Sequence, residues 1–190
     1  MPTILPTAFF DRPTVAVAEN LLGKVLVYQS GHTVQRAIIT EVEAYDGPKD
    51  RACHAHRGRT ERNEPMFGPA GHWYIYFVYG MHWMLNIVSG KEGYPAAILI
   101  RGVCPCQHDT ALDGPGKITR ALGIDGSFNA KKSARGTGLW IEDAHGPIPQ
   151  NAVQRTPRIG VDSAGEWAAK PYRFVLRSTP KCIQGVAYRE

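Results

Sequence analysis

The chain has 190 residues, of which 43% are hydrophobic and 21% are charged, as in an ordinary globular protein with a buried core. No apolar run approaches the roughly 20 residues of a membrane span. The four cysteines have neither a paired C-x-x-C layout nor the density of a disulfide scaffold, so we expect reduced thiols. The formal net charge of +5, spread along the chain rather than gathered in a tail, weakly favours a polyanionic partner.

The N-terminal region is predicted to contain one helix. Residues 1–6 lack the basic start and apolar core of a signal peptide, so we expect the protein to stay inside the cell. Asp11 can cap a helix that has Pro13 in its first turn and Gly23 at its end.

A β-hairpin is predicted next, and its second strand carries acidic residues. The runs 24–29 and 33–45 alternate in polarity around the turn signal Ser30-Gly31. Strands rich in β-branched residues tolerate acids poorly, so the acids indicate either a solvated face or a working site. With a period of two, one face carries Ile39, Glu41, Glu43 and Tyr45, and the other carries Ile38, Thr40, Val42 and Ala44.

Residues 46–71 form a long polar segment with many Gly-Pro and Glu-Pro turn signals, which cannot hold one regular element. Long loops of this kind are usually functional or disordered, and we expect an ordered lid. Cys53, His54 and His56 could begin a zinc site, but the sequence offers no second half of such a site, so no metal is expected.

A second hairpin is predicted over residues 73–88, where two β-rich aromatic runs flank a Tyr-Gly break. A three-residue loop from Tyr79 to Met81 would place Tyr76 and Asn86 on one face, whereas a two-residue loop would separate them. Tyr79 at the tip either projects outward or packs under a neighbouring loop. Exposed aromatic rings beside arginines suit stacking on bases or insertion between them.

The remaining chain is predicted to add short strands and one short helix. Because the sequence has no internal repeat, linker or low-complexity tract, residues 1–190 are expected to form one α+β domain. The predicted elements are strands over residues 96–102, 139–142, 158–161 and 172–177 and a helix over residues 117–122.

The acidic strand favours general-base chemistry. No Ser or Cys lies in a motif that would make it a nucleophile, and no glycine-rich phosphate loop is present. A strand carboxylate facing aromatic and basic groups suits a base that activates water. Glu41 and Glu43, about 7 Å apart by two strand rises, also suit a sugar-directed glycoside hydrolase, although they stand side by side. A non-catalytic nucleic-acid-binding module is a further alternative.

Several motifs, spread in order along the chain, resemble those of one known family. They are Phe9-Phe10-Asp11, Glu43-Ala44-Tyr45, His54, Met66-Phe67, Tyr76-x-x-Tyr79-Gly80-Met81, Asn86, Arg101, Gly114-Pro115-x-Lys117 and Ala164-Gly165-Glu166-Trp167-Ala168-x-Lys170-Pro171. With these motifs the chain is similar to the alkyladenine (3-methyladenine) DNA glycosylases. The resemblance implies a curved, mostly antiparallel sheet with a protruding β-hairpin and flanking helices, and no metal or organic cofactor.

The resemblance also implies an activity and a set of site residues. The expected reaction is excision of alkylated or deaminated purines, with the damaged nucleotide flipped out of the duplex. Glu43 would activate the water that attacks C1′, and Arg101 would lie near it and near the target phosphate. The other implied site residues are Tyr45, His54 and Tyr76, which stack on the flipped base, Asn86, which crowds the exocyclic amine of guanine, and Tyr79, which enters the minor groove.

The implied partner is double-stranded DNA that contains damaged purines, bound by a monomer that has no membrane contact. The implied location is the cytoplasm and nucleoid of a bacterium or the nucleus of a eukaryote. The chain departs from the family pattern in a short segment over residues 102–113, in a lid that is one residue shorter near Thr60, and at His82 and Trp83 of the hairpin.

Overall fold

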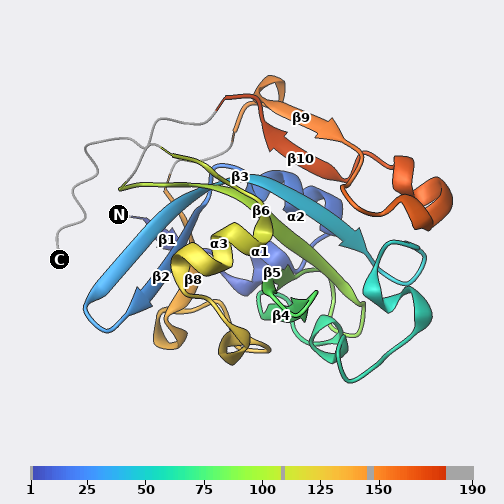
Figure 1. Cartoon of the computed structure of the whole chain (residues 1–190), viewed down its shortest axis with the longest axis horizontal. Helices are drawn as coiled ribbons and strands as arrows, with labels where there is room; N and C mark the ends of the chain where they lie inside the picture. Colours follow the sequence, from blue (N-terminus) through green and yellow to red (C-terminus); the bar gives the residue numbers. More distant parts are fainter. Residues whose placement is uncertain (1, 108–109, 145–147, 179–190) are drawn as a thin grey trace.

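The computed structural model describes residues 2–107, 110–144 and 148–178, and its fold is α+β, as predicted (Figure 1). One curled antiparallel sheet has the strand order β1-β8-β2-β3-β6-β5-β4, while β10 joins β3 to β9 and β7 pairs with β6. The strands are β1 (Thr3–Ile4), β2 (Val25–Ser30), β3 (Thr33–Asp46), β4 (Trp73–Val78), β5 (His82–Val88), β6 (Ala96–Pro105), β7 (Leu112–Asp113), β8 (Leu139–Asp143), β9 (Val153–Thr156) and β10 (Arg173–Leu176).

Short helices connect and cover these strands. Helix α2 packs on β3 and β6, and α3 packs on β5 and β6. Their buried residues Val17, Leu21, Ile118 and Leu122 join the main hydrophobic cluster of the sheet. The helices are α1 (Thr7–Phe10), α2 (Thr14–Leu21) and α3 (Pro115–Leu122), with the 3₁₀ helices η1 (His54–Arg57), η2 (Glu64–Phe67), η3 (Gly126–Phe128), η4 (Arg135–Thr137), η5 (Gln150–Ala152) and η6 (Asp162–Ala169).

The start of α2 differs from the prediction. The residue before the helix is Pro13, whose side chain cannot accept a hydrogen bond. The prediction that Asp11 caps this helix is therefore wrong. Asp11 instead ends α1, where its N–H donates to the carbonyl of Thr7. Gly23 follows shortly after the helix with a φ of +77°, in agreement with its predicted role as a stop.

The β2–β3 hairpin is confirmed, but β3 is not a regular strand. Its pairing with β6 shifts between Ile39 and Glu41 and again between Glu41 and Val42. Such a bulge reverses the alternation of side chains. Ile39 consequently packs in the same buried cluster as Val42 and Ala44, so the prediction that it shares a face with the acids is wrong.

Residues 46–71 are held by their own hydrogen bonds around a buried asparagine. The side-chain amide of Asn63 donates to the carbonyls of His54, at 3.2 Å, and Gly58, at 2.9 Å. Its side-chain oxygen accepts from the N–H of Thr60 at 2.7 Å. The segment expected to be an ordered lid is therefore a polar loop that contains η1 and η2. Within this polar loop, Met66 is buried.

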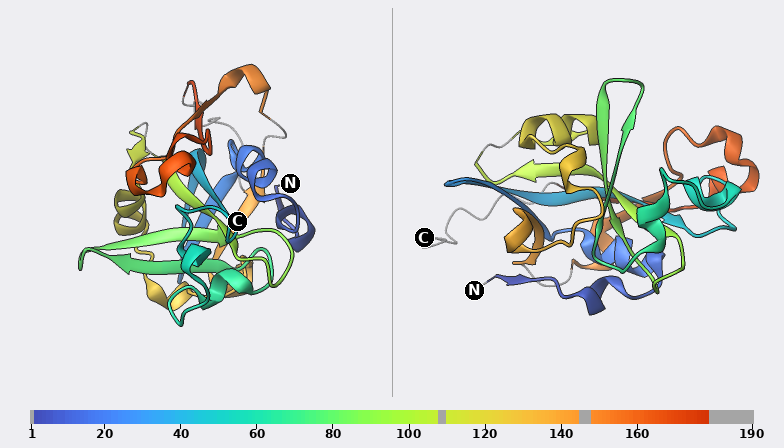
Figure 2. Two further views of the ribbon diagram at one scale, coloured as in Figure 1. Left: turned by 90° about the vertical axis from the view of Figure 1, so that its right-hand side faces the viewer. Right: turned by 90° about the horizontal axis from the view of Figure 1, so that it is seen from below.

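The β4–β5 hairpin protrudes from the body of the molecule (Figure 2). Val78 pairs with His82, which leaves the predicted three-residue loop from Tyr79 to Met81. Only the part of β5 from Asn86 onward pairs with β6, so the tip of the hairpin extends beyond the sheet.

The predicted strand over residues 158–161 is wrong. The strand in this region, β9, ends at Thr156, and Arg158 to Val161 are irregular. Their polar groups bind side chains instead of a strand partner, because Arg158 is buried in an ion pair and the N–H of Ile159 donates to a carboxylate.

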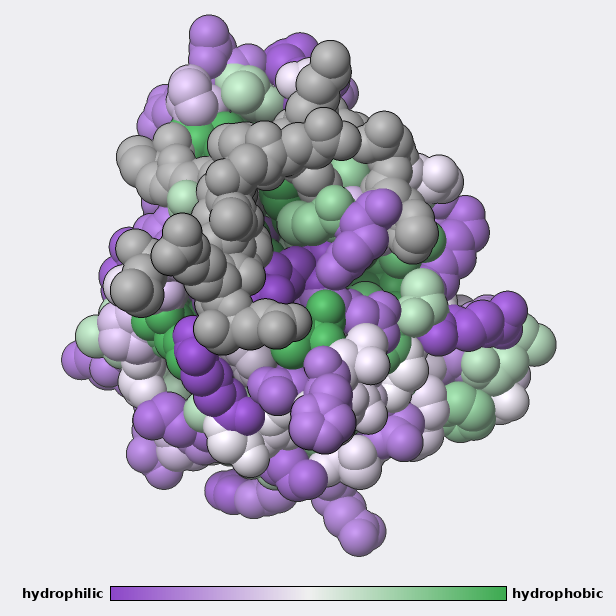
Figure 3. Space-filling model, turned by 90° about the vertical axis from the view of Figure 1, so that its left-hand side faces the viewer, coloured by the Kyte–Doolittle hydropathy of each residue, from purple (hydrophilic) through white to green (hydrophobic). Residues whose placement is uncertain are grey.

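On the face shown in Figure 3, hydrophilic residues surround small apolar patches in the coloured part of the surface. Among the residues that the structure describes, no helix is long and apolar enough to cross a membrane.

Candidate active site

Glu43 is a fully buried acid in the middle of the sheet. It pairs with Leu99 of β6 on one side and with Arg173 of β10 on the other. Burying a carboxylate is costly unless donors and positive charge compensate for the lost water. The donors that reach Glu43 come from the same strand, from the neighbouring strand and from the C-terminal quarter of the chain.

Both oxygens of the Glu43 carboxylate accept hydrogen bonds. The N–H of Ile159 donates to Oε1 at 2.8 Å, and the hydroxyl of Tyr45 donates to Oε2 at 2.9 Å. Nη1 of Arg101 lies 3.5 Å from Oε2 and supplies the positive charge. The carboxylate is thus held in one orientation, with an arginine as its counter-ion.

Arg101 reaches this site because of the bulge. The second register shift between β3 and β6 falls at Arg101, between the paired residues Ile100 and Gly102. A Cβ at Gly102 would lie 2.8 Å from Cβ of Glu41, so only glycine allows the two strands to approach this closely. Nothing in the local pattern of either strand points to this arrangement.

Glu41 has a different environment from Glu43. Its Oε1 accepts from Nε of Arg173 at 2.6 Å and lies 3.2 Å from Nε of Arg101. Two guanidinium groups therefore occupy this carboxylate. Glu41 helps to position Arg101, and this arrangement does not resemble a pair of acids that flank a sugar.

A cavity of about 410 Å³ opens beside this carboxylate cluster, within the usual size range of ligand sites. Six of the seven predicted site residues line the wall of this cavity. The seventh, Glu43, is buried behind the wall. The lining residues come from β3, the polar loop, both strands of the hairpin, β6, α3 and the segment around Ile159. The predicted ones are Tyr45, His54, Tyr76, Tyr79, Asn86 and Arg101.

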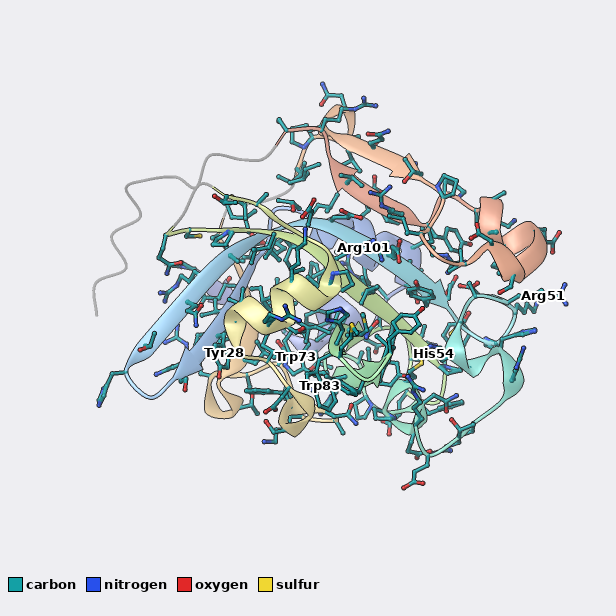
Figure 4. The ribbon with its side chains drawn as sticks, in the orientation of Figure 1. Tyr28, Arg51, His54, Trp73, Trp83 and Arg101 are labelled. Carbon is teal, nitrogen blue, oxygen red and sulfur yellow. The ribbon has the colours of Figure 1, made fainter. Side chains whose placement is uncertain are left out.

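Aromatic rings form one side of the cavity. The ring centroids of His54 and Tyr76 are 4.6 Å apart, and those of Tyr74 and Tyr76 are 5.1 Å apart. Figure 4 shows His54 and Arg101 on separate elements of the same half of the molecule, and Arg51 extending outward at its edge. Such a wall of rings suits a flat aromatic ligand.

The hydroxyl groups in the cavity stay protonated at neutral pH. Burial, together with the charge of Glu43, raises the pKa of Tyr45 well above its usual value. Burial also raises the pKa of Tyr76 to about 12 and that of Tyr74 further still. The phenols therefore act as hydrogen-bond donors rather than as anions.

His54 is neutral at neutral pH. Desolvation, and then the nearby charge of Arg62, lower the pKa of its imidazole below the usual value. Its Nδ1 lies 2.8 Å from the hydroxyl of Tyr74. If the tyrosine donates in this contact, the imidazole carries its proton on Nε2, where it is a donor.

Asn86 is buried and fixed. Its amide nitrogen donates to the carbonyls of Tyr74, at 3.0 Å, and Met84, at 3.1 Å. These bonds hold the side chain against the floor of the cavity on the same face of the hairpin as Tyr76.

Tyr79 projects from the tip of the hairpin, which decides between the two predicted alternatives. Its side chain is 88% exposed, and its φ of +52° lies in the left-handed region that favours glycine. Met81 beside it is also exposed. The tip therefore presents apolar surface to solvent at the edge of the cavity.

The residues considered for a zinc site have other partners. Nδ1 of His56 lies 3.0 Å from the carbonyl of Pro48, and Sγ of Cys53 contacts the carbonyl of Pro95. Burial raises the pKa of Cys53 to about 11. Over residues 2–107, 110–144 and 148–178, no three His, Cys, Asp or Glu side chains form a group that could hold a metal ion.

Cys53 is a free thiol, as predicted, and Cys182 lies outside the described residues.

The sequence pattern missed Arg158, Asp50 and the N–H of Ile159. Arg158 and Asp50 form a buried ion pair, and Ile159 supplies a donor to Glu43. A buried arginine has to have an acidic partner, but the partner lies 108 positions away and no local pattern identifies it.

The site thus consists of a buried carboxylate beneath an aromatic cavity, with a projecting tyrosine beside it. Comparisons with known proteins show the class of enzyme to which the chain belongs. The class is that of hydrolytic DNA glycosylases, which act on DNA. The chain belongs to the methylpurine-DNA glycosylase family, whose model matches residues 8–180.

Relatives match over most of the chain. A protein of Anaeromyxobacter dehalogenans strain 2CP-1 is 47% identical over 179 residues, which cover 93% of this chain and 83% of that protein. A protein of Myxococcus xanthus is 43% identical, and the match covers 95% of this chain and 94% of that protein. One of Methanocella arvoryzae is 44% identical and covers 95% of both chains. All three are named, provisionally, as 3-methyladenine DNA glycosylases.

Proposed function

We propose that the protein excises alkylated and deaminated purines from double-stranded DNA. The damaged nucleotide flips into the aromatic cavity, and water activated by Glu43 attacks C1′ of its sugar. The observation that carries this proposal is the Glu43 carboxylate, fully buried below the cavity and held by donors on both oxygens. A carboxylate in this position can take a proton from water and stabilise an oxocarbenium-like centre.

The contacts of the carboxylate leave room for a water as a further donor, because each oxygen has two lone pairs and the bonds from Ile159 and Tyr45 use one on each. The longest of these contacts is the 3.5 Å separation between Oε2 and Nη1 of Arg101. We infer that the attacking water enters between Glu43 and Arg101. Arg101 then stays close enough to contact both the water and the target phosphate.

The cavity supports recognition of a flipped base. Tyr45 and Tyr76 line the cavity and would stack on the base, and the fixed side chain of Asn86 would crowd the exocyclic amine of guanine. Flipping costs a few kcal/mol, and least for damaged or mispaired bases. Tyr79 would fill the vacated position in the stack and so oppose the return of the nucleotide.

Deaminated purines belong to the proposal because of His54. An N-alkylated purine is a cation and leaves readily, whereas a neutral base needs a donor to stabilise its departing negative charge. A neutral imidazole with its proton on Nε2 is such a donor, and in that tautomer Nδ1 accepts from the hydroxyl of Tyr74.

We further propose that residues 1–190 act as one glycosylase domain and as a monomer, without a cofactor, at the chromosomal DNA inside the cell. The main hydrophobic cluster supports the single domain, because it contains residues from Leu5 to Leu176.

The first prediction concerns Glu43→Gln, which keeps the shape of the side chain but removes its basicity. Excision should fall by at least about 100-fold, because a general base contributes 10²- to 10⁴-fold. The assay uses duplex oligonucleotides that each carry one 3-methyladenine, 7-methylguanine, hypoxanthine or ethenoadenine, followed by cleavage at abasic sites.

The binding of damaged duplex by the variant is the control, and it should remain. Equal turnover by Glu43→Gln would refute the assigned base. Cleavage of an aryl glycoside, with all four duplexes left intact, would favour the sugar-directed alternative.

A further inference from the structure

We propose that Arg158 is a positioning residue for this reaction, which holds in place the two donors that fix the Glu43 carboxylate. The inference rests on the proposed function, because it takes Glu43 as the base. Arg158 does not line the cavity wall and acts through Ile159 and Tyr45.

The guanidinium of Arg158 ties together two regions that are distant in sequence, residues 44–50 and residues 158–167. It forms a bidentate ion pair with Asp50, with Nη2 at 2.8 Å from Oδ1. Nη1 also donates to the carbonyl of Ala44 at 2.7 Å, and Nη2 donates to that of Trp167 at 3.2 Å. These contacts join the end of β3, the first turn of the polar loop and η6.

One donor to Glu43 is bonded directly to Arg158. Ile159 follows it in the chain, and its N–H donates to Oε1. The side chain of Ile159 is 48% exposed, so its own packing does little to fix this N–H. The buried guanidinium of the preceding residue is the anchor that fixes it.

The other donor lies under the guanidinium. The central carbon of the Arg158 guanidinium is 4.8 Å from the ring centroid of Tyr45, whose hydroxyl donates to Oε2 of Glu43. A cation over the face of an aromatic ring is attracted by the ring, and burial strengthens this attraction. Arg158 therefore fixes the ring whose hydroxyl orients the second carboxylate oxygen.

Asp50 is itself preorganised for this role. Its carboxylate accepts from the N–H of Asp46 at 3.1 Å and from the N–H of Ala52 at 3.0 Å. Burial opposes the charge of Arg158, but the hydrogen bond and charge of Asp50 outweigh it and raise the pKa of Arg158. Because a buried ion pair adds little net stability, its precise geometry points to positioning.

The test variant is Arg158→Lys. Lysine keeps a positive charge opposite Asp50 but lacks the planar fork that reaches both carbonyls and covers the ring. With a duplex that carries a methylated purine, the single-turnover excision rate should fall about 10- to 100-fold, because small misplacements of catalytic groups have effects of that size. Affinity for a duplex with a stable abasic-site analogue should stay within about 3-fold.

A second variant removes both buried charges, Arg158→Gln with Asp50→Asn, and it should lose excision in the same way. The control is Lys24→Met, which breaks a partly buried ion pair, Nζ to Oδ1 of Asp143 at 2.7 Å, away from the site. It should lower the melting temperature and leave the excision rate unchanged.

A wild-type rate in either folded Arg158 variant would overturn the inference, as would an equal loss of rate in Lys24→Met at the same melting temperature. Wild-type turnover by Glu43→Gln would instead refute the proposed function, so the two failures are distinguishable.

Discussion

A single acid in a doubly paired strand shows how this site is built at the scale of residues. Glu43 is fully buried, and its negative charge is compensated by one arginine, one tyrosine hydroxyl and one backbone N–H. Glu41, two residues earlier, is held by two arginines instead. Two acids of the same type on one strand therefore have different environments, because different donors surround each carboxylate.

The pH dependence of stability is also decided at this scale. The pKa of His54 is lowered in the folded state, so the unfolded chain binds more protons and stability falls as the pH drops below about 6.5. Protonation also places a proton on Nδ1, which then no longer accepts from Tyr74. Melting temperatures between pH 5 and 8 should show a larger acid loss for the wild type than for His54→Gln. Parallel curves for the two proteins would contradict this.

At the scale of elements, the β4–β5 hairpin contributes both to the cavity wall and to the projecting tip. Its base, with Tyr76 and Asn86, forms a wall of the cavity, while its tip extends beyond the sheet. The rigid pairing along β4 and β5 fixes the position of Tyr79 relative to the cavity. In the proposed mechanism, the cavity therefore holds the flipped base while Tyr79 fills the gap that the base leaves in the duplex.

Replacement of this tip residue, Tyr79→Ser, tests the hairpin. Because the side chain is exposed, the melting temperature should hardly change, in line with about 0.5 kcal/mol or less for surface substitutions. Excision from a paired duplex should fall by about 10-fold, since the flipped state loses the ring that opposes its return. The loss should be smaller for the same lesion opposite a mismatch, where flipping costs less. An equal loss on both duplexes would argue against insertion.

At the scale of the whole molecule, the positive charge of the chain matches its substrate. A net charge of +5 attracts duplex DNA of any sequence, and phosphate contacts release counter-ions. Affinity for undamaged duplex should therefore weaken by at least about 10-fold between 50 and 200 mM salt. The excision rate at saturating enzyme should change much less, because the Glu43 carboxylate is buried and salt screens buried charges only weakly. A salt-independent affinity, measured by fluorescence anisotropy, would contradict this.

The sequence by itself determined what depends on neighbours along the chain. Alternating polarity and a Ser-Gly turn gave the β2–β3 hairpin, and the aromatic run with its Tyr-Gly break gave the projecting tip. The acids of β3 stood out because strands tolerate them poorly. The motifs around them indicated the family that the comparisons show.

Only the tertiary structure decided how the acid is held. The bulge that moved Ile39 to the core face and brought Arg101 to Glu43 depends on two strands that approach closely at Gly102. The donor from Ile159 lies 116 positions from its acceptor, and the partners in the Arg158 ion pair are 108 positions apart. Contacts between segments so distant leave no periodic trace in the sequence, because each depends on the packing of the whole sheet.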